Sequence, residues 1–336
     1  ELKVNQKDSF RALQELHKEC NDWLLGYLSY DLKNEVEDLE STHDDLQQTP
    51  DLYFFQPEKL VIIQEDCCEF HYPEYLQNDV NRDLQAIQEQ ASISENQVSD
   101  VSIRQAISRD DYLSSVGRIL EHIQLGDIYE MNFCQTFYAE DVQIAPLEVF
   151  RKLNKIAESP FAAYCQFDQH YILSASPERY IKKTGNQLIS QPIKGTAKRL
   201  SNRKLDQEIA LKLQNDPKER AENIMITDLV RNDMAKTAQK GSVNVDELCG
   251  LYSFKTVHQL ISTISSKLKE ETGIDTILQT TFPMGSMTGA PKLSAMQIIE
   301  KYENNKRGVY SGAIGYIMPG GDFDFNVVIR SILYNA

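Results

Sequence analysis

Residues 163–182 read AYCQFDQHYILSASPERYIK, a run dense in aromatic and β-branched side chains. Such side chains pack well on a pleated sheet, so the run predicts strands. Similar runs lie at 128–138 and 309–334, and the second predicts a hairpin turning at Pro319-Gly320-Gly321. Strands and helices do not alternate regularly along the chain. We therefore expect an α+β fold built on large antiparallel sheets.

Helices are predicted between these strand runs. Residues 202–214 and 219–233 carry apolar or acidic side chains at helical spacing. An earlier helix can be capped by Ser108 or Asp110 and should end near Gly126. The helices are thus segregated from the strands, as an α+β fold requires.

The first hundred residues are organised separately. Buried strands are predicted at 23–30, 53–55 and 60–63. Residues from about 77 to about 101 are rich in Asn, Gln, Asp and Ser, which predicts a solvated helix or a linker. We expect an N-terminal lobe of the same fold, residues 1–100, and a main region, residues 101–336, that carries the chemistry.

The composition limits the classes of function. The chain has 336 residues with 50 Asp and Glu against 35 Lys and Arg, so its field repels nucleic acid and anionic membrane surfaces. No apolar run approaches the roughly 20 residues of a membrane helix. The six cysteines show neither metal-type nor redox-type spacing. We expect a soluble cytoplasmic protein with neither nucleic acid nor membrane as partner.

Lys194 and Glu178 are the first candidates for chemistry. Lys194 lies between a proline and a glycine in Gln191-Pro192-Ile193-Lys194-Gly195-Thr196, and Glu178 follows Ser176-Pro177. The segment between them is long enough for two strands and a tight turn, which would make the two side chains neighbours. Such a pair can serve as nucleophile and general acid/base if burial favours the neutral amine. A surface ion pair is the alternative.

Two more polar residues are candidates. Glu222 lies one turn into a helix that Asp216-Pro217 predicts, where it would either bind a hard cation such as Mg²⁺ or complement the helix dipole. His258 lies in an apolar strand and is either catalytic or a satisfied core residue.

Residues 282–292, FPMGSMTGAPK, form a loop of small and hydroxyl residues before a helix predicted at 293–302. Such a loop can direct backbone N–H groups at a carboxylate, or it can be only a tight turn. The Gly-Lys-Ser/Thr pattern of a nucleotide-binding loop is absent from it.

Five blocks in order carry a resemblance to a known family. They are Gly126-Asp127-Ile128-Tyr129, Ser176-Pro177-Glu178, Pro192-Ile193-Lys194-Gly195-Thr196, Ala221-Glu222-Asn223 with residues 228–233, and Thr288-Gly289-Ala290-Pro291-Lys292. In these blocks the chain resembles the chorismate-utilising enzymes, whose fold is a large antiparallel two-sheet sandwich flanked by helices. Members that make anthranilate carry Ala at the position of Lys194, whereas those that aminate chorismate at carbon 4 carry Lys.

The resemblance implies a transferase reaction and a set of site residues. The reaction would convert chorismate to 4-amino-4-deoxychorismate, the first step toward para-aminobenzoate and folate, with ammonia from a separate glutamine amidotransferase subunit. Lys194 would attack ring carbon 2, Glu178 would protonate the leaving 4-hydroxyl, and His258 would stand near the ring. Glu222 would bind Mg²⁺. The substrate-binding residues would be Ser286, Thr288, Gly289, Tyr310 and Arg330.

The chain departs from the family pattern in three places. Met284 stands where many members have Gly, the N-terminal lobe matches loosely, and members continue beyond the position of Ala336 into a second Mg²⁺-binding Glu. We therefore keep anthranilate synthesis and a non-catalytic chorismate-binding role as alternatives. Isomerisation to isochorismate uses water as nucleophile, and the lysine disfavours it.

Overall fold

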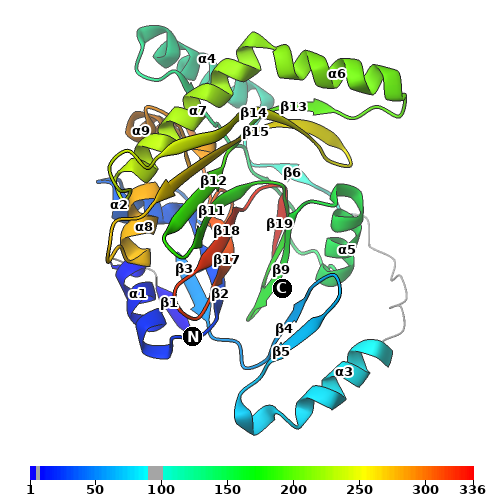
Figure 1. Ribbon diagram of the computed structural model, residues 1–336. Coiled ribbons are helices and arrows are strands. Elements are labelled where there is room, and N and C mark those ends of the chain that lie inside the picture. Colours follow the sequence, from blue (N-terminus) through cyan, green and yellow to red (C-terminus); the bar gives the residue numbers. More distant parts are fainter. Residues whose placement is uncertain (5–7, 90–100) are drawn as a thin grey trace.

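The computed structural model describes residues 1–4, 8–89 and 101–336. Within these ranges ten strands form one antiparallel sheet through the centre of the molecule (Figure 1). In spatial order they are β1 (Leu2–Val4), β3 (Leu52–Phe55), β2 (Leu24–Leu28), β17 (Ala313–Ile317), β18 (Phe323–Val327), β11 (Arg179–Thr184), β12 (Gln187–Gln191), β15 (Val257–Lys267) and β13 (Ile193–Lys198), and β14 (Asn244–Ser253) also pairs with β15. The N-terminal strands join the sheet through β2 and β17, so the predicted lobe of residues 1–100 shares it with the rest of the chain.

A second sheet packs on one face of the large one. It consists of β19 (Ser331–Asn335), β10 (His170–Ser176) and β9 (Phe161–Phe167). Tyr27 and Tyr53 of the large sheet meet Phe167 of the small sheet, with ring centroids 5.2 and 5.0 Å apart. Alternate residues of each strand face opposite sides, so these rings fill the space between the two sheets. The predicted two-sheet α+β sandwich is confirmed.

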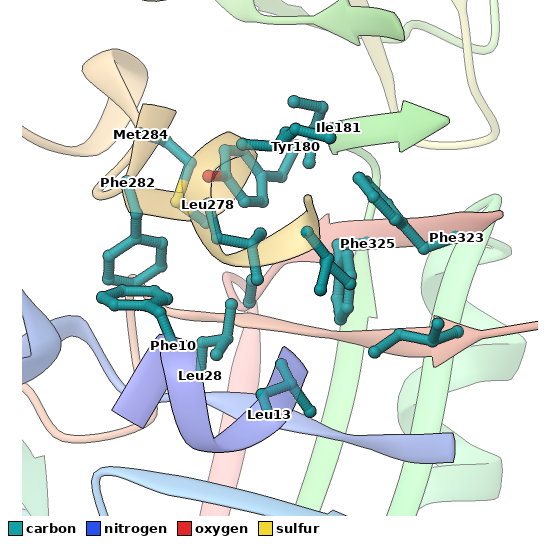
Figure 2. Close-up of a cluster of buried hydrophobic side chains, with 14 of the residues drawn as sticks. Phe10, Leu13, Leu28, Tyr180, Ile181, Leu278, Phe282, Met284, Phe323 and Phe325 are labelled. Atoms are coloured by element: carbon teal, nitrogen blue, oxygen red, sulfur yellow. The ribbon is translucent and has the colours of Figure 1, made fainter. Parts of the chain in front are cut away.

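The other face of the large sheet is covered by helices α1 (Ser9–Cys20) and α8 (Ile274–Thr281). Figure 2 shows this core, in which the Phe10 ring of α1 lies beside the Phe282 ring, with 6.2 Å between the centroids, and Leu278 of α8 and Phe325 of the sheet belong to the same buried cluster. Burying one such side chain stabilises the fold by roughly 1.5–3 kcal/mol. This core supports β11 and the segment that leads to Glu178.

Helices α6 (Arg203–Asn215) and α7 (Pro217–Ala235) lie over the β13–β15 end of the sheet (Figure 1). Beside this end, β7 (Glu130–Met131) pairs with β16 (Gly289–Ala290). The remaining elements are α2 (Lys33–Val36), α3 (Asp79–Glu89), α4 (Arg109–Leu125), α5 (Pro146–Ala157), α9 (Lys292–Tyr302), β4 (Leu60–Ile63), β5 (Cys68–His71), β6 (Arg104–Gln105), β8 (Phe137–Tyr138) and the 3₁₀ turns Tyr30–Leu32, Glu74–Leu76 and Gly285–Met287. In the ranges given above, no helix combines the length and the apolar character that crossing a membrane demands.

The predicted helices are confirmed together with their caps. Ser108 caps α4 by accepting a hydrogen bond from the Asp111 N–H at 3.1 Å, and Gly126 ends the helix at φ 84°. Asn202 and Asp216 cap α6 and α7 in the same way. These short polar side chains fix where each helix begins.

Several strand predictions are wrong in detail. Residues 128–138 form only the two-residue strands β7 and β8, and β4 pairs with β5 alone, leaving Ile63 75% exposed. The hairpin of β17 and β18 is confirmed, but β19 leaves it and pairs with β10 in the small sheet. For residues 77–101, predicted as a solvated helix or a linker, the structure has helix α3 over Asp79–Glu89, and residues 90–100 lie outside the described residues.

Candidate active site

The backbone around Lys194 is bent and tightly held. The Asn223 side chain, on α7, donates to the Lys194 carbonyl at 3.2 Å and to the Leu260 carbonyl at 3.0 Å. Gly195 has φ +92°, and a Cβ there would approach Glu219 and Leu260 to 3.2 Å. The pairing of β13 with β15 shifts register at this point. Glycine thus permits the bend that the backbone makes directly after Lys194.

The Lys194 amine has loose contacts. Its Nζ lies 3.7 Å from Glu130 Oε1 and donates to Asn132 Oδ1 at 3.5 Å, the long limit for a hydrogen bond. The lysine and glutamate side chains are 17% and 16% exposed. Within the described parts of the chain, Glu130 Oε1 is buried and accepts no hydrogen bond. The amine is therefore sheltered without being locked into a short ion pair.

Glu178 lies at the start of β11 and is only 4% exposed. Burial raises the pKa of its carboxyl to about 7, against the lowering effects of the Ser286 hydroxyl, the Lys194 charge, the Ile193 backbone N–H and the Arg330 charge. These influences act over short range, so Glu178, Lys194, Ser286 and Arg330 share one neighbourhood. The raised pKa favours the protonated form of Glu178, which can act as an acid.

The loop around Ser286 is fixed by its own hydrogen bonds. Asn132 donates from its side chain to the Ser286 carbonyl at 2.6 Å and from its backbone to the Thr288 carbonyl at 2.8 Å. The Thr288 hydroxyl donates to the Met284 carbonyl at 3.1 Å. A Cβ on Gly289 would lie 2.2 Å from the Glu130 carbonyl oxygen, so only glycine permits the contact. Thr288 and Gly289 shape the loop, and the Ser286 hydroxyl reaches Glu178.

Met284 does not disturb this loop. Its backbone is extended at φ −61°, ψ 135°, a conformation open to any residue, and its side chain packs in the core (Figure 2). The departure from Gly at this position therefore leaves the loop geometry intact.

Glu222 lies on α7 with its side chain 32% exposed. Its partner is Lys218, 3.2 Å away and 78% exposed, and its charge also raises the pKa of Glu130. Across the described residues there is no group of three or more His, Cys, Asp and Glu that could hold a metal ion. Mg²⁺ commonly takes one or two carboxylates and fills its other positions with water and substrate oxygens. The accessible Glu222 carboxylate can be one such ligand, because its partner Lys218 is exposed and can move away when a cation binds.

Tyr310 and Arg330 line a cavity of about 1420 Å³ beside β19. Burial raises the pKa of Tyr310 to about 12, so its hydroxyl stays protonated. Burial lowers the pKa of Arg330 while the charge of Glu178 raises it, which places Arg330 between this cavity and Glu178. A guanidinium here suits a substrate carboxylate.

The structure does not bring His258 to Lys194. Its Nε2 lies 3.0 Å from Asp206 Oδ1, on α6, and its Nδ1 lies 2.8 Å from the Ser253 hydroxyl. With a carboxylate on Nε2, the neutral ring donates there and accepts from Ser253 at Nδ1. Both nitrogens are occupied, and the ring is 2% exposed. In this arrangement the side chain joins β15 to α6, and a place for His258 near the substrate ring stays a prediction.

Three residues of the site were missed by the sequence reasoning. Glu130 follows Tyr129 directly and Asn132 lies two residues further on, in a run that predicted only a strand. Gln259 follows His258, and strand alternation turns its side chain to the opposite face, where it donates to Thr196 Oγ1 at 3.3 Å. The Gln259 Oε1 is buried and accepts no hydrogen bond in the described part of the chain. Alternation along the predicted strand was the available signal for Gln259.

Comparison with known proteins agrees with this geometry. A family model described as chorismate binding enzyme matches residues 2–336. Aminodeoxychorismate synthase component 1 of Escherichia coli (strain K12) is 35% identical over 310 residues, covering 92% of this chain and 68% of that protein. Anthranilate synthase component 1 of Saccharolobus solfataricus is 31% identical over 312 residues, covering 93% of this chain and 72% of that protein.

A solved structure shows the same fold. The crystal structure of anthranilate synthase component I from Streptococcus pneumoniae TIGR4 superposes with a TM-score of 0.82 at 28% identity. The match covers 92% of this chain and 72% of that one. The large sheet, the small sheet and the flanking helices thus have the arrangement of an enzyme scaffold.

Proposed function

Since the chain belongs to the chorismate binding enzyme family, we propose that it aminates chorismate at ring carbon 4 and yields 4-amino-4-deoxychorismate, toward para-aminobenzoate and folate. One observation carries the proposal. The Lys194 amine is largely buried, and its charge acts on the buried carboxyl of Glu178, whose pKa burial raises to about 7.

The two groups supply complementary chemistry. Lys194 is the nucleophile that adds to ring carbon 2, and Glu178 is the acid that protonates the departing 4-hydroxyl. Proton transfer from a positioned carboxyl contributes roughly 10²–10⁴ in rate. Ammonia then adds at carbon 4 and expels the lysine. We leave His258 out of the catalytic set because Asp206 and Ser253 occupy its ring.

The surrounding residues position the substrate. Arg330 and Tyr310 bind the enolpyruvyl side chain, and the Ser286 hydroxyl orients Glu178. The Thr288–Gly289 backbone shapes the substrate loop. Glu222 is the protein ligand of Mg²⁺, which neutralises a substrate carboxylate when bound.

The ammonia donor is a separate glutamine amidotransferase subunit, as the name "component 1" of the Escherichia coli relative suggests for that protein. We place the reaction in the cytoplasm, where a reducing environment suits the six free cysteines, two of them exposed.

Anthranilate synthesis is the second candidate. The Saccharolobus and Streptococcus relatives carry that name, and the fold match to the latter is close. The lysine at position 194 is the residue that favours attack on carbon 2 by the protein itself.

Product analysis tests the proposal. The purified chain is incubated with chorismate, MgCl₂ and ammonium chloride, and the products are separated by chromatography and identified by mass. We expect 4-amino-4-deoxychorismate. Anthranilate and pyruvate as products would show that the chain is an anthranilate synthase, and isochorismate would show that water is the nucleophile. Tight chorismate binding without any product would show a non-catalytic role.

A further inference from the structure

We propose that Glu130 accepts the proton of the Lys194 amine when that amine attacks the ring, an inference that rests on the proposed function. Glu130 is outside the blocks that carry the family resemblance. Its carboxylate is the charged group nearest to the reacting nitrogen, with Oε1 3.7 Å from Nζ.

The backbone of Glu130 is held on both sides. The residue pairs with Ala290 across β7 and β16, and the Tyr129 N–H donates to the Ala290 carbonyl at 2.8 Å. The Asn132 N–H donates to the Thr288 carbonyl at the same distance. Gly289 lets the two strands approach so closely that a Cβ would not fit. The carboxylate therefore stays within reach of Lys194.

The Glu130 carboxylate has an unused oxygen. Oε1 is buried and has no hydrogen-bond partner among the described residues, which is costly for a structural side chain. Burial raises the pKa of Glu130, Lys194 on β13 lowers it, and Glu222 and Lys218 on α7 act in opposite senses. The result is a stronger proton acceptor than a surface carboxylate. Asn132, the other neighbour of the amine, has an amide that takes up no proton.

Two carboxyl groups, Glu178 and Glu130, account for every proton transfer in the reaction. When Nζ bonds to carbon 2, the 4-hydroxyl leaves as water with the proton of Glu178, and Nζ becomes a secondary ammonium. Glu130 takes one proton from Nζ. When ammonia bonds to carbon 4 and the bond from carbon 2 to Nζ breaks, Nζ keeps the electron pair and recovers its proton from Glu130. The new ammonium at carbon 4 returns a proton to Glu178, so chorismate and ammonia give product and water.

Glu130→Gln tests the inference with two readouts. The first is kcat for aminodeoxychorismate formation at saturating chorismate, ammonium and Mg²⁺. The second is the rate at which trinitrobenzenesulfonate modifies Lys194 in the free enzyme at pH 7, located by peptide mass spectrometry. We expect kcat to fall about 10²- to 10⁴-fold. Modification should become severalfold faster, because removing a negative charge beside the amine favours its neutral form.

Local unfolding would also slow turnover and would expose Lys194 to the reagent, so opposite changes in the two rates indicate a proton acceptor only when the Gln variant unfolds at the same urea concentration as wild type. Glu130→Asp keeps a carboxylate and should retain an intermediate kcat, which guards against misfolding of the Gln variant. Asp228→Asn, an exposed carboxylate of α7 paired with Arg231, is the matched control and should change neither rate.

Turnover of Glu130→Gln within threefold of wild type, or an unchanged rate of Lys194 modification, would overturn the inference. Recovery of kcat at high Mg²⁺ would also overturn it, because Glu130 would then be a metal ligand. If the wild-type chain makes no aminodeoxychorismate, the proposed function fails on its own. The modification rates then decide separately whether Glu130 acts on Lys194.

Discussion

Two polar clusters lie at the β13–β15 end of the large sheet, and their hydrogen bonding differs. In the first cluster, Asp206 on α6 accepts from Arg199 Nε at 2.9 Å, from the Leu200 N–H at 2.8 Å and from His258 at 3.0 Å. In the second cluster, Lys194 meets Glu130 only at 3.7 Å. The first cluster is satisfied and the second is not.

This difference separates a structural cluster from a catalytic one. A satisfied buried network fixes two elements together, here α6 and β15, and leaves no group free for a substrate. The open cluster holds a buried oxygen without a partner and a carboxyl with a raised pKa, both of which cost stability unless a ligand uses them. Variants in the two clusters should therefore change different quantities.

Lys194→Ala should have the largest effect. It removes the proposed nucleophile, so we expect kcat for aminodeoxychorismate to fall about 10⁴-fold or more. Stability should change little, because among the described residues the amine makes one long hydrogen bond and one loose ion pair. Stopped assays and urea unfolding measure both quantities. Lys198→Ala, at an exposed position of the same strand, is the control, and undiminished turnover in Lys194→Ala would contradict the nucleophile role.

Glu178→Gln should follow, with a loss of kcat of about 10²–10⁴. It also tests the pKa, which burial raises from 4.5 to about 7. Between those values the folded chain holds a proton that the unfolded chain releases, so this group's contribution to stability is lost as pH rises through 7.

The Glu178→Gln variant has no titrating carboxyl at this position, so its stability does not fall for this reason as the pH rises. Its melting temperature should therefore rise relative to wild type between pH 5 and pH 8, while the activity of wild type itself should fall above about pH 7. A melting difference that stays constant across this range would show that Glu178 is not a raised-pKa acid.

The helix ends and the closeness of Glu178 and Lys194 could be predicted from the sequence, because both depend on local signals. The predicted caps at Ser108 and Asp216 placed two helices correctly, and the segment between Glu178 and Lys194 correctly suggested that these side chains lie close together. Those inferences depend on chain geometry over short distances. They need no knowledge of which distant strands pair.

The rest depends on long-range packing. A strand pattern does not tell which face meets a helix, so the contact of His258 with Asp206 on α6 could not be predicted. Glu130 was missed because its position depends on the pairing of β7 with β16. Strand β16 lies far along the chain and approaches closely only at Gly289. Neither partner is visible from local periodicity.

In contrast to Lys194→Ala and Glu178→Gln, His258→Asn should lower stability and leave kcat almost unchanged. We expect a loss of about 1–3 kcal/mol in the free energy of unfolding, because the ring is buried and Asp206 and Ser253 lose a partner. The kcat should stay within about threefold of wild type. Gln259→Leu, on the opposite face, is the matched variant and should affect KM or kcat more than stability. A large kcat loss in soluble, folded His258→Asn would return this residue to the catalytic set.

Lys218→Gln should have the smallest effect and tests Glu222. The lysine is 78% exposed and competes with a cation for the Glu222 carboxylate at 3.2 Å. Exposed ion pairs are weak, so removing the lysine should lower the Mg²⁺ concentration for half-maximal turnover only about twofold. Arg231→Gln, which removes an exposed pair from the same helix, should leave that concentration unchanged. Equal responses of the two variants would mean that Mg²⁺ senses only the net charge of the helix, and Glu222 would lose its proposed role as a ligand.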